Sequence, residues 1–291
     1  MQNINPQLYP FQPNFYASVD GRMHYLDEGS GPVLLMVHGT PAWSFSYRKL
    51  IQALSPYFRC IAIDHLGFGL SDKPEQADYS PKAHAERLEQ LISHLQLKDV
   101  SLLVHDFGGP IGLSYALNRP ENVSKVIILN TWMWPLDDYP KIAKGAKIAG
   151  SWLGKMLYKY FNFSPRILVK QAFHDKNKLT KEVHRYYTDV YPDAKSRGGP
   201  TAFAHHLLQS SGWFHQLWQK RHILSRLPII ILWGKHDPLL PISLLDRWKD
   251  ALPNASVHTL EAGHFVQEEQ PEEAAKLIRQ FVSSAVKEEQ E

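Results

Sequence analysis

Several features that would place the chain in a special class are missing from its 291 residues. It has one cysteine, Cys60, which excludes an internal disulfide and favours a reducing compartment, so we expect a cytoplasmic protein. No run approaches about 18 uninterrupted apolar residues, so we expect no membrane-spanning helix. The opening residues, MQNINPQLYP, lack the basic and apolar regions of a signal peptide.

Charge of one sign is also scarce. The formal net charge of +3 is too small to indicate nucleic-acid binding. Hydrophobic residues make up 44% of the chain and aromatic residues 12%, which is enough for a substantial core and excludes a disordered protein. The length fits one large domain with an insertion, or two small domains.

Short apolar runs closed by glycine or proline predict strands. Helical patterns separate most of these runs, such as the one from Ser80 to Leu97, whose apolar residues are spaced three and four apart. This alternation predicts a mostly parallel sheet that is buried on both faces. Ahead of it, alternating residues around Asp20-Gly21 predict a β-hairpin. The runs lie at 33–39, 59–69, 100–109, 123–130, 227–234 and 256–264.

The alternation stops between Asn130 and about Pro228, where the patterns are helical and aromatic. Residues 135–215 carry 13 Lys+Arg against 6 Asp+Glu, a net charge of +7. A helical insertion after one strand of a parallel sheet predicts a cap over the sheet's carboxyl edge, where open α/β sheets bind ligands. We therefore predict a core of residues 1–134 and 216–291 and a cap of residues 135–215.

The run LLVHDFGGPIG, from Leu102 to Gly112, ends in a chemically informative turn. A strand, the pattern small-x-nucleophile-x-small and then a helix form the nucleophile elbow of α/β-hydrolases. The pattern places Asp106 where serine is usual, followed by Phe107, whose side chain has no polar atom. The alternative is an ordinary turn in which the aspartate caps the helix.

Three further motifs favour the elbow. GKHDP follows the run at 227–234 and supplies Asp237, and EAGHF follows the last run and supplies His264. Nucleophile, acid and histidine in this order is the chain order that the α/β-hydrolase fold requires. HGTP follows the run at 33–39 and places Thr40 where the fold provides its second oxyanion N–H. The sequence thus predicts an α/β-hydrolase fold with nucleophile Asp106, base His264 and acid Asp237.

An aspartate nucleophile restricts the chemistry. Its carboxylate, with an ordinary pKa of about 4, is already anionic at neutral pH and needs no base to attack. Attack on a saturated carbon gives an alkyl ester, which water activated by His264 then hydrolyses while Asp237 orients the imidazole. The expected substrates are therefore small apolar electrophiles with a leaving group, and water is the second reactant. We expect neither a cofactor nor a metal in the site.

Five segments together resemble the haloalkane dehalogenases, and the similarity runs from about Gly29 to Glu273. The resemblance implies a cofactor-independent hydrolase that cleaves carbon–halogen bonds, in the branch whose acid follows the penultimate strand. It also implies that the amides of Thr40 and Phe107 form the oxyanion hole, and that Thr40, Phe107, Trp132 and Phe265 contact the substrate. The segments are HGTPAWSFSYRKLI, DHLGFGLSDKP, VHDFGGPIGL, YPDAKSRGGPTAF and AGHFVQEEQPEE.

Two positions depart from the dehalogenase pattern. Dehalogenases usually have Trp directly after the nucleophile and many have Asn after HG, both as halide donors; here these residues are Phe107 and Thr40. We therefore keep open the epoxide hydrolases and the β-lactone decarboxylases, relatives that use the same aspartate. Epoxide hydrolases protonate the leaving oxygen with cap tyrosines. A small-molecule receptor without catalysis is the least favoured reading, because the triad is intact. The candidate cap tyrosines are Tyr158, Tyr160, Tyr186, Tyr187 and Tyr191, and the candidate halide donors are Trp132, Trp134, Trp152 and Trp213.

Other polar residues near the motifs receive structural interpretations. His38 and His105 flank strand ends and are expected to support the neighbouring loops. Ser71 and Ser114 do not lie on strand-to-helix elbows. Asn130 ends the strand before the cap, where some relatives place their acid, but an amide cannot replace a carboxylate.

The beginning of the cap is basic and amphipathic. We interpret this pattern as a solvated outer face whose apolar side covers the pocket. Contact with an anionic membrane is the weaker alternative. The oligomeric state leaves no signal in the sequence. The lysines concerned are Lys141, Lys144, Lys147, Lys155 and Lys159.

Overall fold

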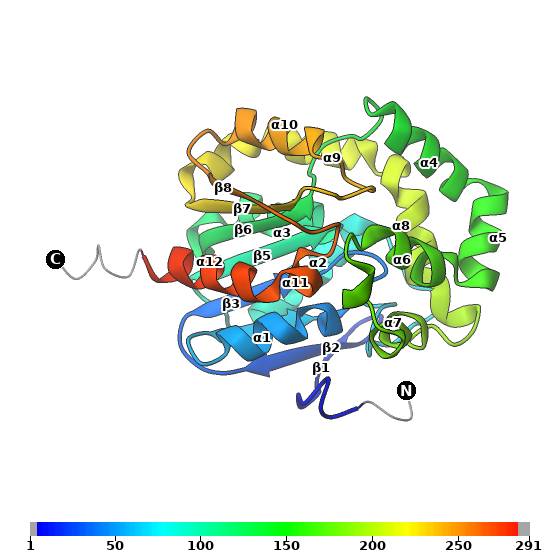
Figure 1. Cartoon of the computed structure of the whole chain (residues 1–291), viewed down its shortest axis with the longest axis horizontal. Helices are drawn as coiled ribbons and strands as arrows, with labels where there is room; N and C mark the ends of the chain where they lie inside the picture. Colours follow the sequence, from blue (N-terminus) through cyan, green and yellow to red (C-terminus); the bar gives the residue numbers. More distant parts are fainter. Residues whose placement is uncertain (1–4, 285–291) are drawn as a thin grey trace.

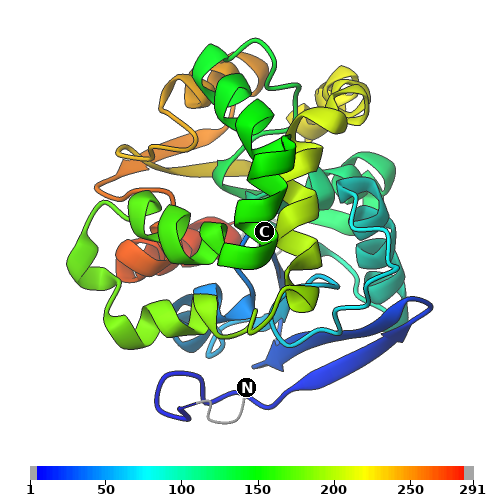
Figure 2. The same ribbon diagram turned by 90° about the vertical axis from the view of Figure 1, so that its right-hand side faces the viewer.

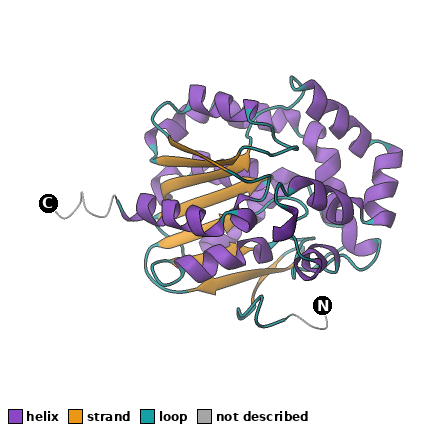
Figure 3. Ribbon diagram, viewed as in Figure 1, coloured by secondary structure: helices purple, strands orange, loops and turns teal. Residues whose placement is uncertain are grey.

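The computed structural model describes residues 5–284 and contains an eight-stranded sheet between layers of helices (Figures 1 and 3). Residues 1–4, part of the stretch for which no signal peptide is expected, and residues 285–291 lie outside the described residues. The strand order is β1-β2-β4-β3-β5-β6-β7-β8. The strands are β1 (Asn14–Ser18), β2 (Gly21–Glu28), β3 (Val33–Val37), β4 (Arg59–Ile63), β5 (Val100–Asp106), β6 (Val123–Thr131), β7 (Ile229–Gly234) and β8 (Ser256–Leu260).

The predicted hairpin and parallel sheet are confirmed. β1 and β2 form an antiparallel hairpin in which Ser18 faces Gly21, and β2 also runs antiparallel to β4. All pairings from β4 through β3 to β8 are parallel. The run predicted over 59–69 is too long, because β4 ends at Ile63 and the chain turns through Gly67 and Gly69, both with positive φ. Every residue of the central strands β5 and β7 is buried, as expected for a sheet covered on both faces.

Helices cover both faces of the sheet. α1 packs against α12 on one face, and α2 packs against α3 on the other (Figure 1). Ser80 caps α2 by accepting a hydrogen bond from the amide of Ala83. The helices are α1 (Arg48–Leu54), α2 (Pro81–His94), α3 (Gly108–Asn118), α4 (Pro140–Gly150), α5 (Trp152–Phe161), α6 (Val169–Ala172), α7 (Lys181–Thr188), α8 (Gly198–Gln209), α9 (Ser211–Gln219), α10 (Ser243–Ala251), α11 (Val266–Glu269) and α12 (Pro271–Ser283).

The helices α4 to α9 interrupt the alternation between β6 and β7. α4 and α5 pack against each other and against α8, and the group lies to the right of the sheet in Figure 1 and faces the viewer in Figure 2. Among the residues that the structure describes, no helix is long and apolar enough to cross a membrane.

Candidate active site

Asp106 is the last residue of β5 and sits in a strained turn into α3. Its φ of 53° lies in the left-handed region, which a non-glycine residue adopts only when the surrounding structure enforces it. The carbonyl of Asp106 accepts a hydrogen bond from the hydroxyl of Thr131. A Cβ at Gly39 would collide with Oδ1 of Asp106, so only glycine lets the loop after β3 approach this closely. The local geometry is that of the predicted elbow.

Two backbone amides act on the Asp106 carboxylate. The amide of Thr40 donates to Oδ1 over 2.7 Å. Burial alone would raise the pKa of this carboxyl, but His264 and the amide of Phe107 hold it below its usual value. Asp106 is therefore anionic. Its Oδ1 accepts the amide of Thr40, one of the two amides expected to form the oxyanion hole.

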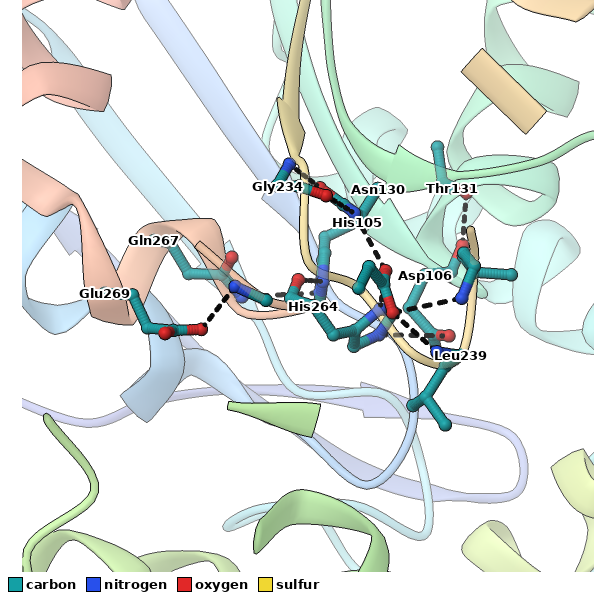
Figure 4. A network of polar contacts seen from close by, with 12 residues as sticks. His105, Asp106, Asn130, Thr131, Gly234, Leu239, His264, Gln267 and Glu269 are labelled. Atoms are coloured by element: carbon teal, nitrogen blue, oxygen red, sulfur yellow. Dashed lines mark hydrogen bonds and ion pairs between the residues drawn. The ribbon is translucent and has the colours of Figure 1, made fainter. Parts of the chain in front are cut away.

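His264 joins the two carboxylates, as the loop after β8 brings its ring beside Asp106 (Figure 4). Its Nε2 lies 3.5 Å from Oδ2 of Asp106, and its Nδ1 donates to Oδ2 of Asp237 over 2.7 Å. Burial favours the neutral ring, but the negative charges of Asp237 and Asp106 overcome it and raise the pKa of His264 to about 10. The three predicted triad residues thus form one connected network.

Asp237 is fixed on both of its oxygens. Oδ1 accepts the amides of Leu239 and Leu240 over 2.8 and 3.0 Å, and Oδ2 accepts the side-chain amide of Asn130 over 2.8 Å. Asn130 therefore supports the carboxylate from the end of β6 and does not replace it. These three amide donors, together with His264, leave Asp237 one orientation.

The residues given structural interpretations make structural contacts. His38 contacts the carbonyl of Gly39 through Nδ1 and accepts the amide of His65, and His105 contacts the carbonyl of His264 over 2.9 Å. Burial and the positive charge of His264 lower the pKa of His105 to about 3, so its ring stays neutral. Ser71 donates to the carbonyl of Asp64, and Ser114 donates to a carbonyl within α3.

Glu269 is a site residue that the sequence analysis did not identify. Its carboxylate accepts the amide of Gly263, next to His264, and the amides of His174 and Asp175 beyond α6. The amide of His264 also donates to the carbonyl of Ala172 in α6 over 2.8 Å. The histidine loop is thus hydrogen-bonded to the helical insertion. The sequence alone does not indicate that an acidic residue five positions after the histidine binds these amides, because only the fold brings them together.

A cavity of about 560 Å³ opens above Asp106. Its walls come from the carboxyl ends of the strands and from α4, α5 and α8, and they are mostly apolar. All four predicted substrate-contacting residues line it, namely Thr40, Phe107, Trp132 and Phe265, as do Asp106 and Asp237. Such a wall suits an apolar substrate that carries little hydrogen-bonding capacity.

The structure separates the four candidate tryptophans. Trp132 lines the cavity, and its Nε1 is buried without a hydrogen-bond partner. Trp134 packs against Trp218 and Trp248, Trp152 is 76% exposed, and Trp213 lines a different, smaller pocket. Only Trp132 among the four is placed to face a reacting molecule.

The cap tyrosines separate in the same way. Tyr158 lines the cavity, and its pKa is raised strongly by burial and by the negative charge of Asp106. Tyr160 is exposed. The hydroxyls of Tyr186, Tyr187 and Tyr191 hydrogen-bond elsewhere, to Asn5, Glu268 and Pro41.

Comparisons with known proteins agree with the fold and the motifs. Residues 32–271 match the family model described as the alpha/beta hydrolase fold. The chain is 33% identical to haloalkane dehalogenase 2 of Mycobacterium tuberculosis over 95% of its own length and 97% of that protein. It is also 32% identical to a cis-3-alkyl-4-alkyloxetan-2-one decarboxylase of Shewanella oneidensis, over 95% and 90% of the two chains.

The structural comparison supports the same architecture. A mutant of the haloalkane dehalogenase DatA from Agrobacterium tumefaciens superposes with a TM-score of 0.85 at 24% identity, covering 96% of this chain and all of that one. The chain therefore belongs to the alpha/beta hydrolase fold family and is an enzyme. Within that family the chain is a relative of the haloalkane dehalogenases, as the sequence motifs predict.

Proposed function

We propose that this enzyme hydrolyses carbon–halogen bonds of haloalkanes through an ester at Asp106, giving an alcohol and a halide ion. The proposal rests mainly on one observation. An anionic aspartate at the elbow faces an apolar cavity, with His264 and Asp237 aligned behind it. Residues 135–215 act as the cap that closes this cavity, and the relatives named haloalkane dehalogenase support the assignment.

The first step uses Oδ2 of Asp106, the carboxylate oxygen that faces His264 and not the amide of Thr40. Oδ1 is held by the amide of Thr40, so Oδ2 attacks the carbon that bears the halogen. The new C–O bond forms as the carbon–halogen bond breaks, and the halide leaves with the bonding electrons. No proton moves in this step, which is why a carboxylate suits it.

The second step uses His264 as the base. Its Nε2 takes a proton from water, and the resulting hydroxide attacks the carbonyl carbon of the ester. The negative charge that develops on Oδ1 is stabilised by the amides of Thr40 and Phe107. Collapse of this intermediate expels the alkoxide, which takes the proton from His264 and leaves as the alcohol. The regenerated carboxyl group of Asp106 then passes its own proton to His264, which restores the ion pair of the free enzyme.

Two unpaired polar atoms are the candidate donors to the departing halide. The Oγ1 of Thr40 and the Nε1 of Trp132 are both buried without a partner, and both residues line the cavity. Buried donors are normally satisfied, so an unpaired pair beside a nucleophile indicates a place for an anion. Trp132 then supplies the indole N–H that Phe107 lacks.

Replacement of Trp132 by Phe should slow halide release by about tenfold to a hundredfold. A hydrogen bond to a charged group contributes about 1.5–3 kcal/mol, and the halide gathers its charge in a dry cavity. The loss should be larger for 1-chlorobutane than for 1-bromobutane. The carbon–chlorine bond is the stronger one, so its cleavage depends more on a hydrogen bond to the leaving halide. The measurement is single-turnover halide release from both substrates.

Trp134→Phe is the matched control for that variant. Its indole Nε1 is likewise buried and unpaired, but the ring packs against Trp218 and Trp248. It should leave halide release unchanged. Equal rates in Trp132→Phe and the wild type would remove Trp132 from the halide site.

Decarboxylation of β-lactones is the second candidate. Curated relatives with this name match about as well as the dehalogenases. Phe107 also offers the leaving group no side-chain donor. Attack of Asp106 on the ring carbon would open the lactone to a carboxylate, and loss of CO₂ with departure of the aspartate would give an alkene.

A parallel assay separates these functions. The wild type is incubated with 1-bromobutane, 1,2-dibromoethane, a styrene-type epoxide and a cis-3,4-dialkyl β-lactone. We expect bromide and alcohol from the first two. When 1-iodobutane and 1-chlorobutane are assayed alongside them, bromide and iodide should be released faster than chloride. Release of CO₂ and alkene from the lactone without any halide release would leave Asp106 as the nucleophile. It would show that the substrate is a β-lactone and not a haloalkane.

A further inference from the structure

The outer face of the cap is unusually apolar for exposed protein surface. The expectation that the apolar side of α4 and α5 covers the pocket is only partly right. Gly154, Leu157 and Tyr158 do line the cavity, but other large apolar side chains on these helices point to solvent. Six of the ten exposed large hydrophobic residues of the described chain gather here, and we call them the cap patch: Ile148, Trp152, Leu153, Tyr160, Phe161 and Ile167.

The same segment carries cations without counter-charges. From residue 139 to residue 174 the sequence has seven Lys+Arg and no Asp or Glu. Within the part of the chain that the structure describes, none of the seven forms an ion pair, although twelve other lysines and arginines do. All of them are exposed: Lys141, Lys144, Lys147, Lys155, Lys159, Arg166 and Lys170.

The cap patch also borders the entrance to the cavity. The exposed residues of the cavity wall come from α4 and from the loop after β7, so the cavity opens between these two elements. Ile148 belongs both to the wall and to the patch, and the exposed Ile242 ends the loop after β7. The exposed wall residues are Lys141, Gly145, Ile148, Pro238 and Pro241.

We propose that the cap patch docks on the surface of an anionic lipid bilayer and that apolar substrates enter the cavity from that surface. Large apolar side chains surrounded by unpaired lysines match both layers of such an interface. The rings and aliphatic side chains enter the acyl boundary, and the lysines extend to the phosphates. Docking requires no membrane-spanning helix.

A bilayer fits this surface better than a protein partner does. Five of the six apolar residues project from the short helices α4 and α5, and Ile167 lies in the helical turn Ser164–Leu168 that follows them. The cavity beside them is already assigned to the substrate. Juxtamembrane cations each add about 1 kcal/mol of attraction to an anionic leaflet. The inference goes beyond the proposed function, because it concerns binding to a membrane. This binding can be measured without any turnover of a substrate.

Flotation of the purified protein with vesicles tests the proposal. We expect the wild type to float with vesicles of phosphatidylcholine and phosphatidylglycerol, and to stay in solution with phosphatidylcholine alone. Raised salt should release it, because screening weakens the attraction of the lysines. Brominated acyl chains should quench the fluorescence of Trp152, and Trp152→Phe should lose this quenching.

Matched variants locate the surface. Lys147→Glu/Lys155→Glu should lower the partition coefficient by about tenfold or more, since two attractive charges become repulsive. Lys98→Glu/Lys220→Glu has the same charge change outside the cap and should partition like the wild type. Trp152→Ser should weaken docking, whereas Val19→Ser, at another exposed apolar residue, should not. None of these residues lines the cavity, so activity on a water-dissolved substrate should persist in all of them.

Three results would overturn the docking proposal. The first is no salt-sensitive flotation of the wild type with anionic vesicles. The second is equal partitioning of the two double variants. The third is a dimer in sedimentation that Trp152→Ser dissociates, without vesicle binding, since the patch would then join two copies of the chain. Loss of haloalkane turnover with docking intact would instead contradict only the proposed function.

Discussion

His264→Gln treated with 1-bromobutane should carry one butyl group on Asp106 that persists through intact-protein mass spectrometry. The first chemical step needs only the carboxylate, whereas hydrolysis of the ester needs the base. Steady-state turnover should fall by about 10²- to 10⁴-fold, the usual contribution of a general base. The first release of bromide, measured in a single turnover, should remain.

Asp106→Ala is the control for this experiment, because it removes the nucleophile and should form no adduct and release no bromide. Peptide mapping of the adduct must place the butyl group on Asp106. Retained turnover in His264→Gln without an adduct would contradict the two-step mechanism.

The charge of the site explains why His264 can serve as a base despite its raised pKa. In the free enzyme two carboxylates hold the pKa of the ring at about 10, so the ring is protonated at neutral pH. Esterification of Asp106 removes one of those negative charges, and the pKa of His264 falls. The protonated ring can then release its proton to solvent, which accounts for the acid formed together with the halide. The neutral base is thus available at the stage where the mechanism uses it.

The parallel sheet and the three triad residues could be predicted from the sequence because both leave local signals. Buried strands are continuous apolar runs, and the elbow, the acid and the histidine each follow such a run at a fixed position. The type of chemistry then follows from one residue, because the elbow carries Asp106 in place of serine. The predicted strand at 59–69 is too long, since the apolar residues Leu66 and Phe68 continue the run beyond Ile63, where β4 ends.

The cavity wall could not be predicted in the same way. Which tryptophan faces the substrate depends on how the helices pack, and Trp132 and Trp134 are two residues apart with different surroundings. The dehalogenase pattern places Trp at position 107, so the sequence alone makes Phe107→Trp look like a way to supply a halide donor. The Phe107 ring is buried 4.4 Å from the ring of Phe203 and 4.9 Å from that of Trp132, so an indole there overpacks the site.

The contacts that hold the histidine loop were also invisible to the sequence. Glu269 hydrogen-bonds to amides on both sides of the boundary between the core and the inserted helices. These partners are about ninety residues apart in the chain, so no local pattern joins them. The exposure of the cap patch was missed for a related reason, because an amphipathic pattern does not say which face is covered.

Asp237→Asn should lower turnover by about 10²- to 10⁴-fold while the protein still folds. The amide keeps the shape of the carboxylate but cannot support the imidazolium that forms when His264 takes its proton. Alkylation of Asp106 should continue, whereas hydrolysis of the ester should be slower than in the wild type. The variant should therefore accumulate the ester. Stopped-flow measurement of bromide release and mass spectrometry of the quenched enzyme report the two steps.

Asn130→Asp in the Asp237→Asn background is the decisive companion variant. The side chain of Asn130 lies 2.8 Å from the Asp237 oxygen that accepts the His264 proton, so a carboxylate there can reach the same ring. We expect partial recovery of turnover in the double variant and none in Asn130→Ala/Asp237→Asn. Near-normal activity of Asp237→Asn alone would assign the acid to another carboxylate.

The pH dependence of stability gives a second, non-catalytic readout of Asp237. Because the pKa of His264 is raised to about 10 in the folded enzyme from an ordinary 6.5, its ion pairs stabilise the fold fully below about pH 6.5. That contribution is lost as the pH rises from 6.5 towards 10. In Asp237→Asn the pKa of His264 falls, so the free energy of unfolding from urea titrations should decrease less between pH 6.5 and pH 10 than in the wild type. An identical decrease in both proteins would show that Asp237 does not hold the charge of His264.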